Sequence, residues 1–438
     1  MKKVYFRYIY RTVLVSTLII LLSNESSAIP AFARKYKTSC MTCHIAITKR
    51  NAFGEAFRRN GYVMPAQNAR LIKDQPLKLG AEAWKEVWPD AVWPSDIPGT
   101  FPVAAYLQMR MEYNVMPKPQ KDRLTFIFPD DLVLVFGGAF GEEVGFFGSW
   151  GTEYGLFKFY MRFNDLLGPK HFLNIKVGTF EPGIMDGYPG NQRLTLDYTA
   201  VQDYAAAGDW RPRKTRPGLE LNGIITHHLQ YFAGVAQSQG GTEALTTNNK
   251  DFYARLAYKF GGYGLDGDGI LLDSMNRNFA IDNSFTVGLY SYFGNSQKSD
   301  SNKIEYDNKF SRFGADVRWL IENLDLLGGV IYGTDENPNA GNKKLTSMVY
   351  FIEGNYMFYP WLTGVLRFEQ VKSKFGDDDA DKYFNIIPNI TILFRQNVRF
   401  SLEGKMNITG DRTVNGKVNI GDNSDPLKWL KLNAFFAF

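Results

Sequence analysis

Both cysteines of this chain lie in one pentapeptide, Cys40-Met41-Thr42-Cys43-His44. The pattern Cys-x-x-Cys-His is the attachment signal for c-type haem. Two thiols three positions apart can bond the two vinyl groups on one edge of a porphyrin, and the adjacent histidine then lies under the iron as the proximal ligand. These residues predict one covalently bound haem, attached through Cys40 and Cys43 and ligated by His44.

Two other uses of the cysteine pair must be weighed. A thioredoxin-type dithiol is expected in a strand-helix-strand context, and the flanking residues 34–62 lack that pattern. A short-range disulfide would not require the adjacent histidine. The histidine at the required place and the absence of any third cysteine favour haem attachment.

A six-coordinate haem needs a second axial ligand. Met64 is the nearest methionine after the motif, and methionine opposite histidine raises the reduction potential of the iron. Met64 is therefore the candidate distal ligand, although it could instead pack on the haem face. Four other side chains would compete if the chain folds back, namely Met109, Met111, Met116 and His171.

The residues before Met64 predict one helix over 48–60. Thr48 is a candidate N-cap, and Gly61 stands at the stop position. Phe53 and Phe57 are four residues apart and share one face, which we expect to cover the porphyrin.

The predicted haem segment, residues 29–70, is too short to bury its own cofactor, because chains of about 40 residues usually need a metal, disulfides or a partner. The rest of the burial must come from elsewhere in the chain. Arg58 and Arg59 would either pair with haem propionates or remain solvated in a basic last turn, which the helix dipole also favours.

The chain begins with a secretory signal pattern. Four basic residues precede an apolar run at 13–22, and small residues at 26–28 offer a cleavage site. An anchor helix is the alternative, but the run is too short to span a bilayer. Without residues 1–28 the chain has 46 basic and 44 acidic residues, so its charge gives no argument for nucleic-acid binding.

Beyond a linker at 71–100, residues 101–438 predict an all-β domain. In 398–407 apolar residues alternate with Arg, Ser, Glu, Lys and Asn, so one face suits lipid and the other suits water. A soluble β-sandwich also alternates, but these strands exceed the usual five or six residues by far. The chain also ends on an alternating strand at Phe438, which resembles the assembly signal of bacterial outer-membrane barrels.

The segments predict a sixteen-stranded antiparallel transmembrane β-barrel. The predicted strands are 101–115, 131–140, 144–151, 154–165, 170–180, 216–226, 228–238, 250–260, 282–293, 308–321, 324–332, 345–359, 361–372, 381–395, 397–408 and 427–438. Connections after even-numbered strands are mostly short and those after odd-numbered strands mostly long, as expected for periplasmic turns and outer loops. Two connections depart from this rule, the short one at 152–153 and the long inner one at 261–281.

An even number of strands places both barrel ends on the periplasmic side, and sixteen strands enclose a lumen that can hold water or a plug. The haem segment is the candidate plug, and a water-filled pore with this segment beneath it is the alternative. The predicted lumen carries mixed charges, at Arg255, Arg318, Arg367, Glu369, Arg399 and Glu403.

The N-terminal residues also resemble a known family. Two stretches flank the haem motif, Ile29-Pro-Ala-Phe-Ala-Arg-Lys-Tyr36 and Asn51-Ala-Phe-Gly-Glu-Ala-Phe-Arg-Arg-Asn-Gly-Tyr62. Together they are similar to the N-terminal segment of the fused monohaem cytochrome-porin proteins of the bacterial outer membrane. The best-known members of that family act as iron oxidases.

The resemblance implies that Cys40 and Cys43 attach the haem and that His44 is its proximal ligand. It also implies extracellular Fe(II) as electron donor and a periplasmic cytochrome as electron acceptor. It assigns no role to Met64, and it leaves the direction of electron flow open. The alternative function is that of a solute porin in which the haem segment is a structural plug or a redox sensor.

Overall fold

The structure is a computed structural model. It describes residues 31–46, 48–65, 82–92, 99, 102–116, 120–152, 155–185, 193–204, 210–238, 248–270, 282–299, 305–339, 343–378, 380–408, 413–414, 417–418 and 426–438. The predicted signal peptide and much of the predicted linker lie outside these residues. Within the described ranges, no helix is long and apolar enough to cross a membrane.

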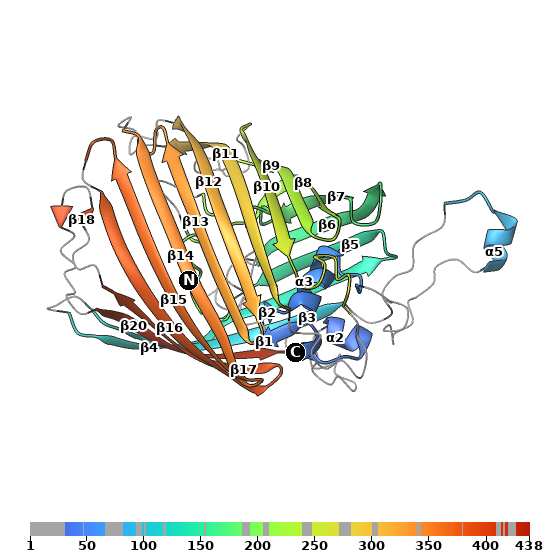
Figure 1. Cartoon of the computed structure of the whole chain (residues 1–438), viewed down its shortest axis with the longest axis horizontal. Helices are drawn as coiled ribbons and strands as arrows, with labels where there is room; N and C mark the ends of the chain where they lie inside the picture. Colours follow the sequence, from blue (N-terminus) through green and yellow to red (C-terminus); the bar gives the residue numbers. More distant parts are fainter. Residues whose placement is uncertain are drawn as a thin grey trace, which may run out of the picture.

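Sixteen antiparallel strands close into one barrel (Figure 1). They are β3 (Val103–Asn114), β4 (Arg123–Phe140), β5 (Val144–Gly151), β6 (Gly155–Leu167), β7 (Leu173–Phe180), β8 (Arg216–Ile225), β9 (Leu229–Gln237), β10 (Lys250–Phe260), β11 (Ser284–Ser299), β12 (Glu305–Ile321), β13 (Leu324–Asp335), β14 (Leu345–Tyr359), β15 (Leu362–Phe375), β16 (Asp381–Arg395), β17 (Val398–Asn407) and β20 (Leu427–Ala437). Each strand pairs with its neighbour along the chain, and β20 pairs with β3 to close the ring. Two further short strands, β18 (Thr413–Val414) and β19 (Lys417–Val418), form a separate hairpin.

The sixteen predicted strands correspond one to one to the observed ones. The start of β4 was predicted at 131, but the strand begins at Arg123 and runs through Pro129. Its pairing shifts between Gln108 and Arg110 of β3, so residues 128–130 form an irregularity in a continuous ladder. The predicted end of β11 at 293 was also too early, because pairing with β12 continues to Ser299.

The two faces of the wall divide as predicted. Phe252 and Leu256 are more than half exposed on the outside, whereas Arg255 between them is 3% exposed. Inside, Arg318 contacts Asp325 at 3.0 Å, and Arg367 contacts Glu369 at 2.8 Å. The buried charges therefore lie on the lumen side and are satisfied by one another.

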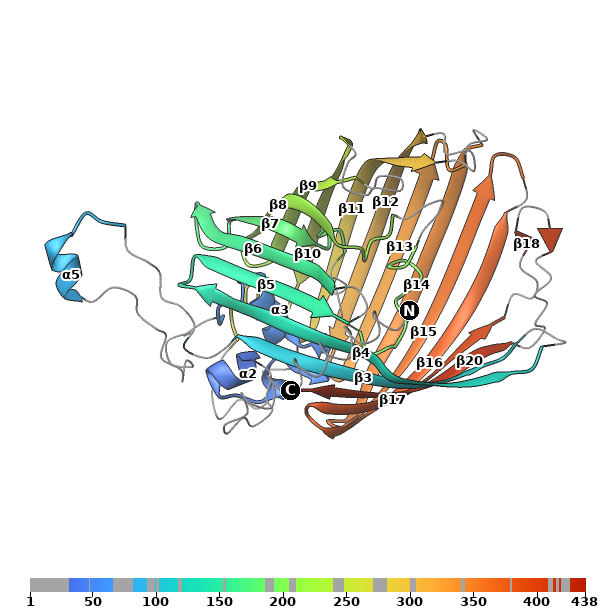
Figure 2. The same cartoon turned by 180° about the vertical axis from the view of Figure 1, so that it is seen from behind.

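The two ends of the barrel differ. One end carries the short connections at 141–143, 226–228, 322–323, 360–361 and 396–397, and we call it the turn end. The chain ends there at Phe438, beside α2 (Ala31–Tyr36), as both views show (Figures 1 and 2). The opposite end, with the long connections, is the loop end.

Residues 31–65, the N-terminal segment, fold as α2, a 3-10 turn η1 (Cys40–Thr42), a hairpin of β1 (His44–Ala46) and β2 (Lys49–Arg50), and α3 (Ala52–Arg59). The predicted helix start at Thr48 was wrong, because Lys49 and Arg50 pair with β1. Asn51 caps α3 instead, accepting a hydrogen bond from the Gly54 amide at 2.9 Å.

The helix end was predicted correctly. Gly61 has φ +69°, which favours glycine. The amides of Gly61 and Tyr62 donate to the carbonyls of Arg58 and Phe57, the pattern of a Schellman C-cap. The chain therefore reverses at Gly61 and returns Met64 to the same side as the motif.

The N-terminal segment lies inside the lumen at the turn end. Lys49, 1% exposed, pairs with Asp325 of β13 at 2.9 Å, and Arg34 donates to the Val103 carbonyl of β3. At Gly145 of β5 an added Cβ would overlap the backbone of Gly61. The segment thus contacts opposite parts of the wall.

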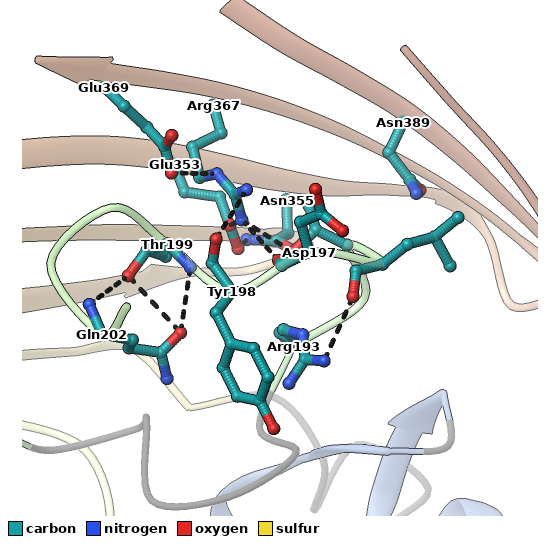
Figure 3. Close-up of polar contacts among 12 residues, drawn as sticks. Arg193, Asp197, Tyr198, Thr199, Gln202, Glu353, Asn355, Arg367, Glu369 and Asn389 are labelled. Atoms are coloured by element: carbon teal, nitrogen blue, oxygen red, sulfur yellow. Dashed lines mark hydrogen bonds and ion pairs between the residues drawn. The ribbon is translucent and has the colours of Figure 1, made fainter. Parts of the chain in front are cut away.

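A second stretch also enters the barrel. Residues 193–204, here called the inner segment, follow β7 and contact Arg367 of β15 (Figure 3). They also contact β17. The Glu403 carboxylate accepts the Leu196 amide at 2.8 Å, and the Arg367 guanidinium donates to Thr195 Oγ1 at 2.8 Å. The sequence indicated only a long outer connection here, so the inward path is a finding of the structure.

Candidate functional site

The motif residues are held in one tight turn. The Cys43 amide donates to the Cys40 carbonyl at 3.2 Å, and Ser39 caps the turn through the Met41 amide at 3.1 Å. The Asn51 side-chain amide donates to the carbonyls of Met41 and Thr42. Asn51 therefore joins the motif to α3, a role that the sequence did not reveal.

Close packing fixes α3 against the motif. Gly54 lies in the first turn of α3, where a Cβ would overlap the Cys43 carbonyl. Only glycine lets the helix backbone approach this far. Phe53 is fully buried behind the turn, and Phe57 faces the cavity described next.

The four predicted haem residues, Cys40, Cys43, His44 and Met64, all line one cavity of about 330 Å³. We call it the main cavity. Its other side is the barrel wall, with lining residues from β3, β4, β5, β6, β7 and β20, including Tyr106, Val135, Phe147, Lys158, Lys176 and Phe435. Neither the N-terminal segment nor the wall encloses this cavity alone.

The ionisation of the motif suits a metal ligand better than a redox dithiol. Burial, and next the charge of Arg50, lower the pKa of His44 to about 4, so its ring is neutral at pH 7 and keeps a free lone pair. Burial also raises the pKa of the Cys40 thiol, which would be the nucleophile of a dithiol, and raises the pKa of the Cys43 thiol to about 12. A reactive dithiol needs a lowered thiol pKa, so the thioredoxin-type alternative fits poorly.

Basic residues surround the main cavity. Arg50 and Arg58 reach it from the N-terminal segment, and Lys158 and Lys176 reach it from β6 and β7. Glu181 is the single carboxylate of the lining, and Lys158 pairs with it. Behind the lining, Glu55 pairs with Arg50 and Arg58, and Glu220 pairs with Lys176 at 2.6 Å. The surface of the cavity itself still presents more basic than acidic groups, which suits a ligand that brings carboxylates.

Arg58 and Arg59 share a buried carboxylate. Glu55, 1% exposed, contacts Arg50 at 2.5 Å, Arg58 at 2.8 Å and Arg59 at 3.5 Å. Burial opposes ionisation of Glu55, but the three guanidinium groups outweigh it and hold the pKa of Glu55 well below its usual range. The solvated alternative is wrong for Arg59, which is 7% exposed, whereas Arg58 lines the cavity.

A tyrosine pair links the N-terminal segment to the wall beside the cavity. The hydroxyls of Tyr62 and Tyr160 lie 2.7 Å apart. The Tyr62 ring stacks between Phe32 and Phe147, with ring centres 5.5 and 5.3 Å away. Tyr160 lies 98 residues from its partner, so no sequence signal pointed to this contact.

The inner segment closes the cavity from within the barrel. Tyr198 lines the cavity, and its ring lies between Arg193 and Arg213, at 3.7 and 4.5 Å from the guanidinium carbons. Its backbone carbonyl accepts from Arg367 at 3.2 Å (Figure 3). Thr48 of the N-terminal segment donates to the Arg193 carbonyl at 3.1 Å, so the two inserted stretches touch.

The competing ligands do not reach the cavity. Met109, Met111 and Met116 are absent from its lining, and His171 lines a separate recess at the turn end. Within the described ranges, no group of three or more His, Cys, Asp and Glu side chains could hold a metal ion.

The residues present fit a c-type haem. The donor set comprises two free thiols, a neutral imidazole and a thioether, which is the set used by covalent Met/His haems. The cavity is mostly apolar, with basic groups in its lining. These are properties of cofactor sites.

Comparisons with known proteins bear on the barrel. No protein-family model and no curated protein sequence matches the chain. Among solved structures it resembles OmpF of Salmonella typhi in complex with daunomycin (11% identity, TM-score 0.52, covering 77% of this chain and 97% of that chain). It also resembles the outer-membrane channel DcaP of Acinetobacter baumannii (13%, TM-score 0.50, 77% and 96%) and the anion-selective porin of Comamonas acidovorans (11%, TM-score 0.50, 77% and 98%). The chain therefore has the fold of outer-membrane porins.

Proposed function

We propose that this protein is an outer-membrane electron carrier of the cytochrome-porin type, in which a barrel holds one covalent c-type haem between its N-terminal segment and its wall. The observation that carries the proposal is that Cys40, Cys43, His44 and Met64 line a single cavity. When bound, the haem supplies a one-electron couple whose potential is raised by Met/His ligation.

The chain's own residues would position and insulate the cofactor. Cys40 and Cys43 would hold one edge covalently, and His44, neutral at pH 7, would present its ring nitrogen. The basic groups Arg50, Arg58 and Lys176 would attract the carboxylates. The Tyr62–Tyr160 contact would fix the N-terminal segment to the wall. The segment would therefore move little when the haem gains or loses an electron.

We further propose that the turn end faces the periplasm, as short connections do in outer-membrane barrels. An extracellular donor such as Fe(II) would then approach from the loop end, and a periplasmic cytochrome would collect the electron at the turn end.

The second candidate is a solute porin whose N-terminal segment is a plug. The fold similarity to channel-forming proteins favours it. An open channel is disfavoured because two stretches of chain occupy the lumen. Lys49 anchors the N-terminal segment to the wall, and Arg367 anchors the inner segment.

Proteoliposomes test both candidates. We expect full-length protein, matured in a host with a c-type haem system, to keep its haem through denaturing electrophoresis. External ferrous iron should then reduce the haem and a trapped acceptor. The Cys40→Ala/Cys43→Ala variant should fold as a barrel but carry no covalent haem, and external ferrous iron should then leave the trapped acceptor oxidised. Matured protein that carries no haem, or that passes no electrons from any external donor while conducting small solutes, would establish the porin.

A further inference from the structure

The turn end carries a recess that is separate from the main cavity. It has a volume of about 210 Å³ and is built by four pieces of chain. The N-terminal segment contributes Asn60, Val63, Met64 and Pro65. The end of β6 contributes Asp165, and the barrel turns contribute Glu142, Lys170, His171, Asp266, Gly267 and Asp268. We call it the acidic recess.

The recess has a strong negative balance. Its lining holds four carboxylates against the single ammonium of Lys170, which lies 3.8 Å from Glu142. Burial lowers the pKa of His171, so this ring adds no positive charge at pH 7. An exposed concave surface of one sign attracts partners of the opposite sign.

Asn60 gives a second, independent indication of a cationic ligand. It is 7% exposed and lines the recess. Its side-chain nitrogen donates to the Asp266 carbonyl at 2.9 Å, but its buried Oδ1 has no hydrogen-bond partner among the described residues. Buried amide oxygens are nearly always paired. An ammonium group in the recess would supply the missing donor after a small movement of the side chains that cover this oxygen.

The recess also lies next to the main cavity. Met64 lines both spaces. A group bound in the recess would therefore be separated from the predicted haem by little more than one side chain.

The long connection after β10 holds this arrangement in place. His227 Nδ1 lies 2.7 Å from the Asp266 carboxylate, and an added Cβ at Gly267 would crowd Pro65 and Ala56. Residues 266–268 of this connection thus contact the N-terminal segment and complete the recess.

We propose that the acidic recess is the docking surface for a soluble electron-carrier protein, and that it receives a lysine side chain from the basic rim around the partner's redox centre. This inference rests on the proposed electron-transfer function and adds the place and the charge of the partner surface.

The test uses the full-length, haem-loaded protein in detergent, reduced and mixed with oxidised mitochondrial cytochrome c, a lysine-rich probe. We expect the second-order rate of electron transfer to fall at least about tenfold between 10 and 500 mM ionic strength, as steered association does. Glu142→Gln and Asp268→Asn, both at exposed residues, should each slow the reaction about threefold at low salt. The matched control Glu322→Gln removes an exposed turn-end carboxylate outside the recess and should change the rate less than about twofold.

Oxidation by ferricyanide separates this inference from the function on which it rests. Ferricyanide should oxidise the haem of all variants without loss of rate. If it oxidises none of them, the electron-transfer function fails and the docking inference fails with it. If it oxidises the haem but the probe reacts at a rate insensitive to salt and to the recess variants, the docking inference alone is wrong. Tight Mn²⁺ binding that Asp268→Asn abolishes would also overturn it, because the recess would then be an ion site.

Discussion

At the scale of single residues, Met64 connects the two spaces that matter for the proposed function. It is 5% exposed and lines both the main cavity and the acidic recess. The Schellman cap at Gly61 places it there, because the chain reverses immediately after α3. Its position therefore depends on the fold of the N-terminal segment and on the connection that covers it.

We predict that Met64→Ala keeps the covalent haem but lowers its reduction potential by on the order of 100 mV, a small part of the roughly 0.8 V that axial ligands span. Loss of a thioether ligand disfavours the reduced iron. Spectroelectrochemical titration measures the shift. Met348→Ala, at an exposed site on the outer face of β14, should leave the potential unchanged. An equal shift in both variants would contradict ligation by Met64.

Glu55 offers a second prediction at this scale. Glu55→Gln leaves three clustered guanidinium groups without their carboxylate, and breaking a buried ion pair costs about 3–5 kcal/mol. We expect faster hydrogen exchange in α3, measured by mass spectrometry, while the barrel strands stay protected. Glu322→Gln is the matched control, and similar exchange in both variants would show that the cluster does not hold α3.

The Glu55 cluster also predicts a pH dependence. The folded pKa is lowered, so the stabilisation is present above the unfolded value of about 4.3. It is lost as the pH falls below that value toward the folded pKa. Protection of α3 in the wild type should therefore decline in acid, and Glu55→Gln should lack this decline. An unchanged acid response in the variant would assign the loss to other groups.

The motif residues were predictable because their spacing is local, whereas their partners were not. Cys40, Cys43 and His44 stand within five positions. Tyr160 and Lys158 reach the same cavity from β6, a hundred residues away. Alternation predicted only that β6 has a lumen face. The lumen residues that contact the motif depend on the position of the N-terminal segment in the barrel, and no sequence pattern predicts that position.

At the scale of elements, alternation located all sixteen strands, because a lipid face opposes a lumen face. The lengths of most connections indicated the end of the barrel at which each one lies. The interruptions were harder. The start of β4 was predicted eight residues too late, because the strand continues through Pro129 with an irregular register. The start of α3 was misplaced because the hairpin of β1 and β2 competes for Lys49 and Arg50.

The inner segment gives a prediction at this scale. Arg367 donates to Thr195 Oγ1 and to two backbone carbonyls of the segment. Glu369 of β15 and Glu403 of β17 also hold the segment, so we expect Arg367→Met to loosen the segment and to raise the single-channel conductance in planar bilayers. The matched control is Arg395→Met, at an exposed position at the end of β16. Equal conductance in the two variants would mean that the segment does not limit the channel.

At the scale of the whole molecule, the barrel closes through its own strand ladder, and the N-terminal segment adds contacts to the wall rather than a strand to the ring. We predict that a chain lacking residues 31–65 still assembles into a barrel, shown by heat-modifiable mobility in electrophoresis. Its conductance should exceed that of the full chain, because the lumen loses its plug. A deleted chain that fails to assemble would show that the segment is needed for folding.

The shared walls of the main cavity also constrain the order of biogenesis. Cys40 and Cys43 line a space bounded in part by the wall of the barrel, so the closed barrel restricts the approach of a second protein to them. If the haem is joined by an enzyme, as the motif predicts, we expect the thioether bonds to form in the periplasm before the barrel closes. Closure of the barrel in the membrane would then enclose haem that is already attached, and a chain whose barrel closed first would remain without haem.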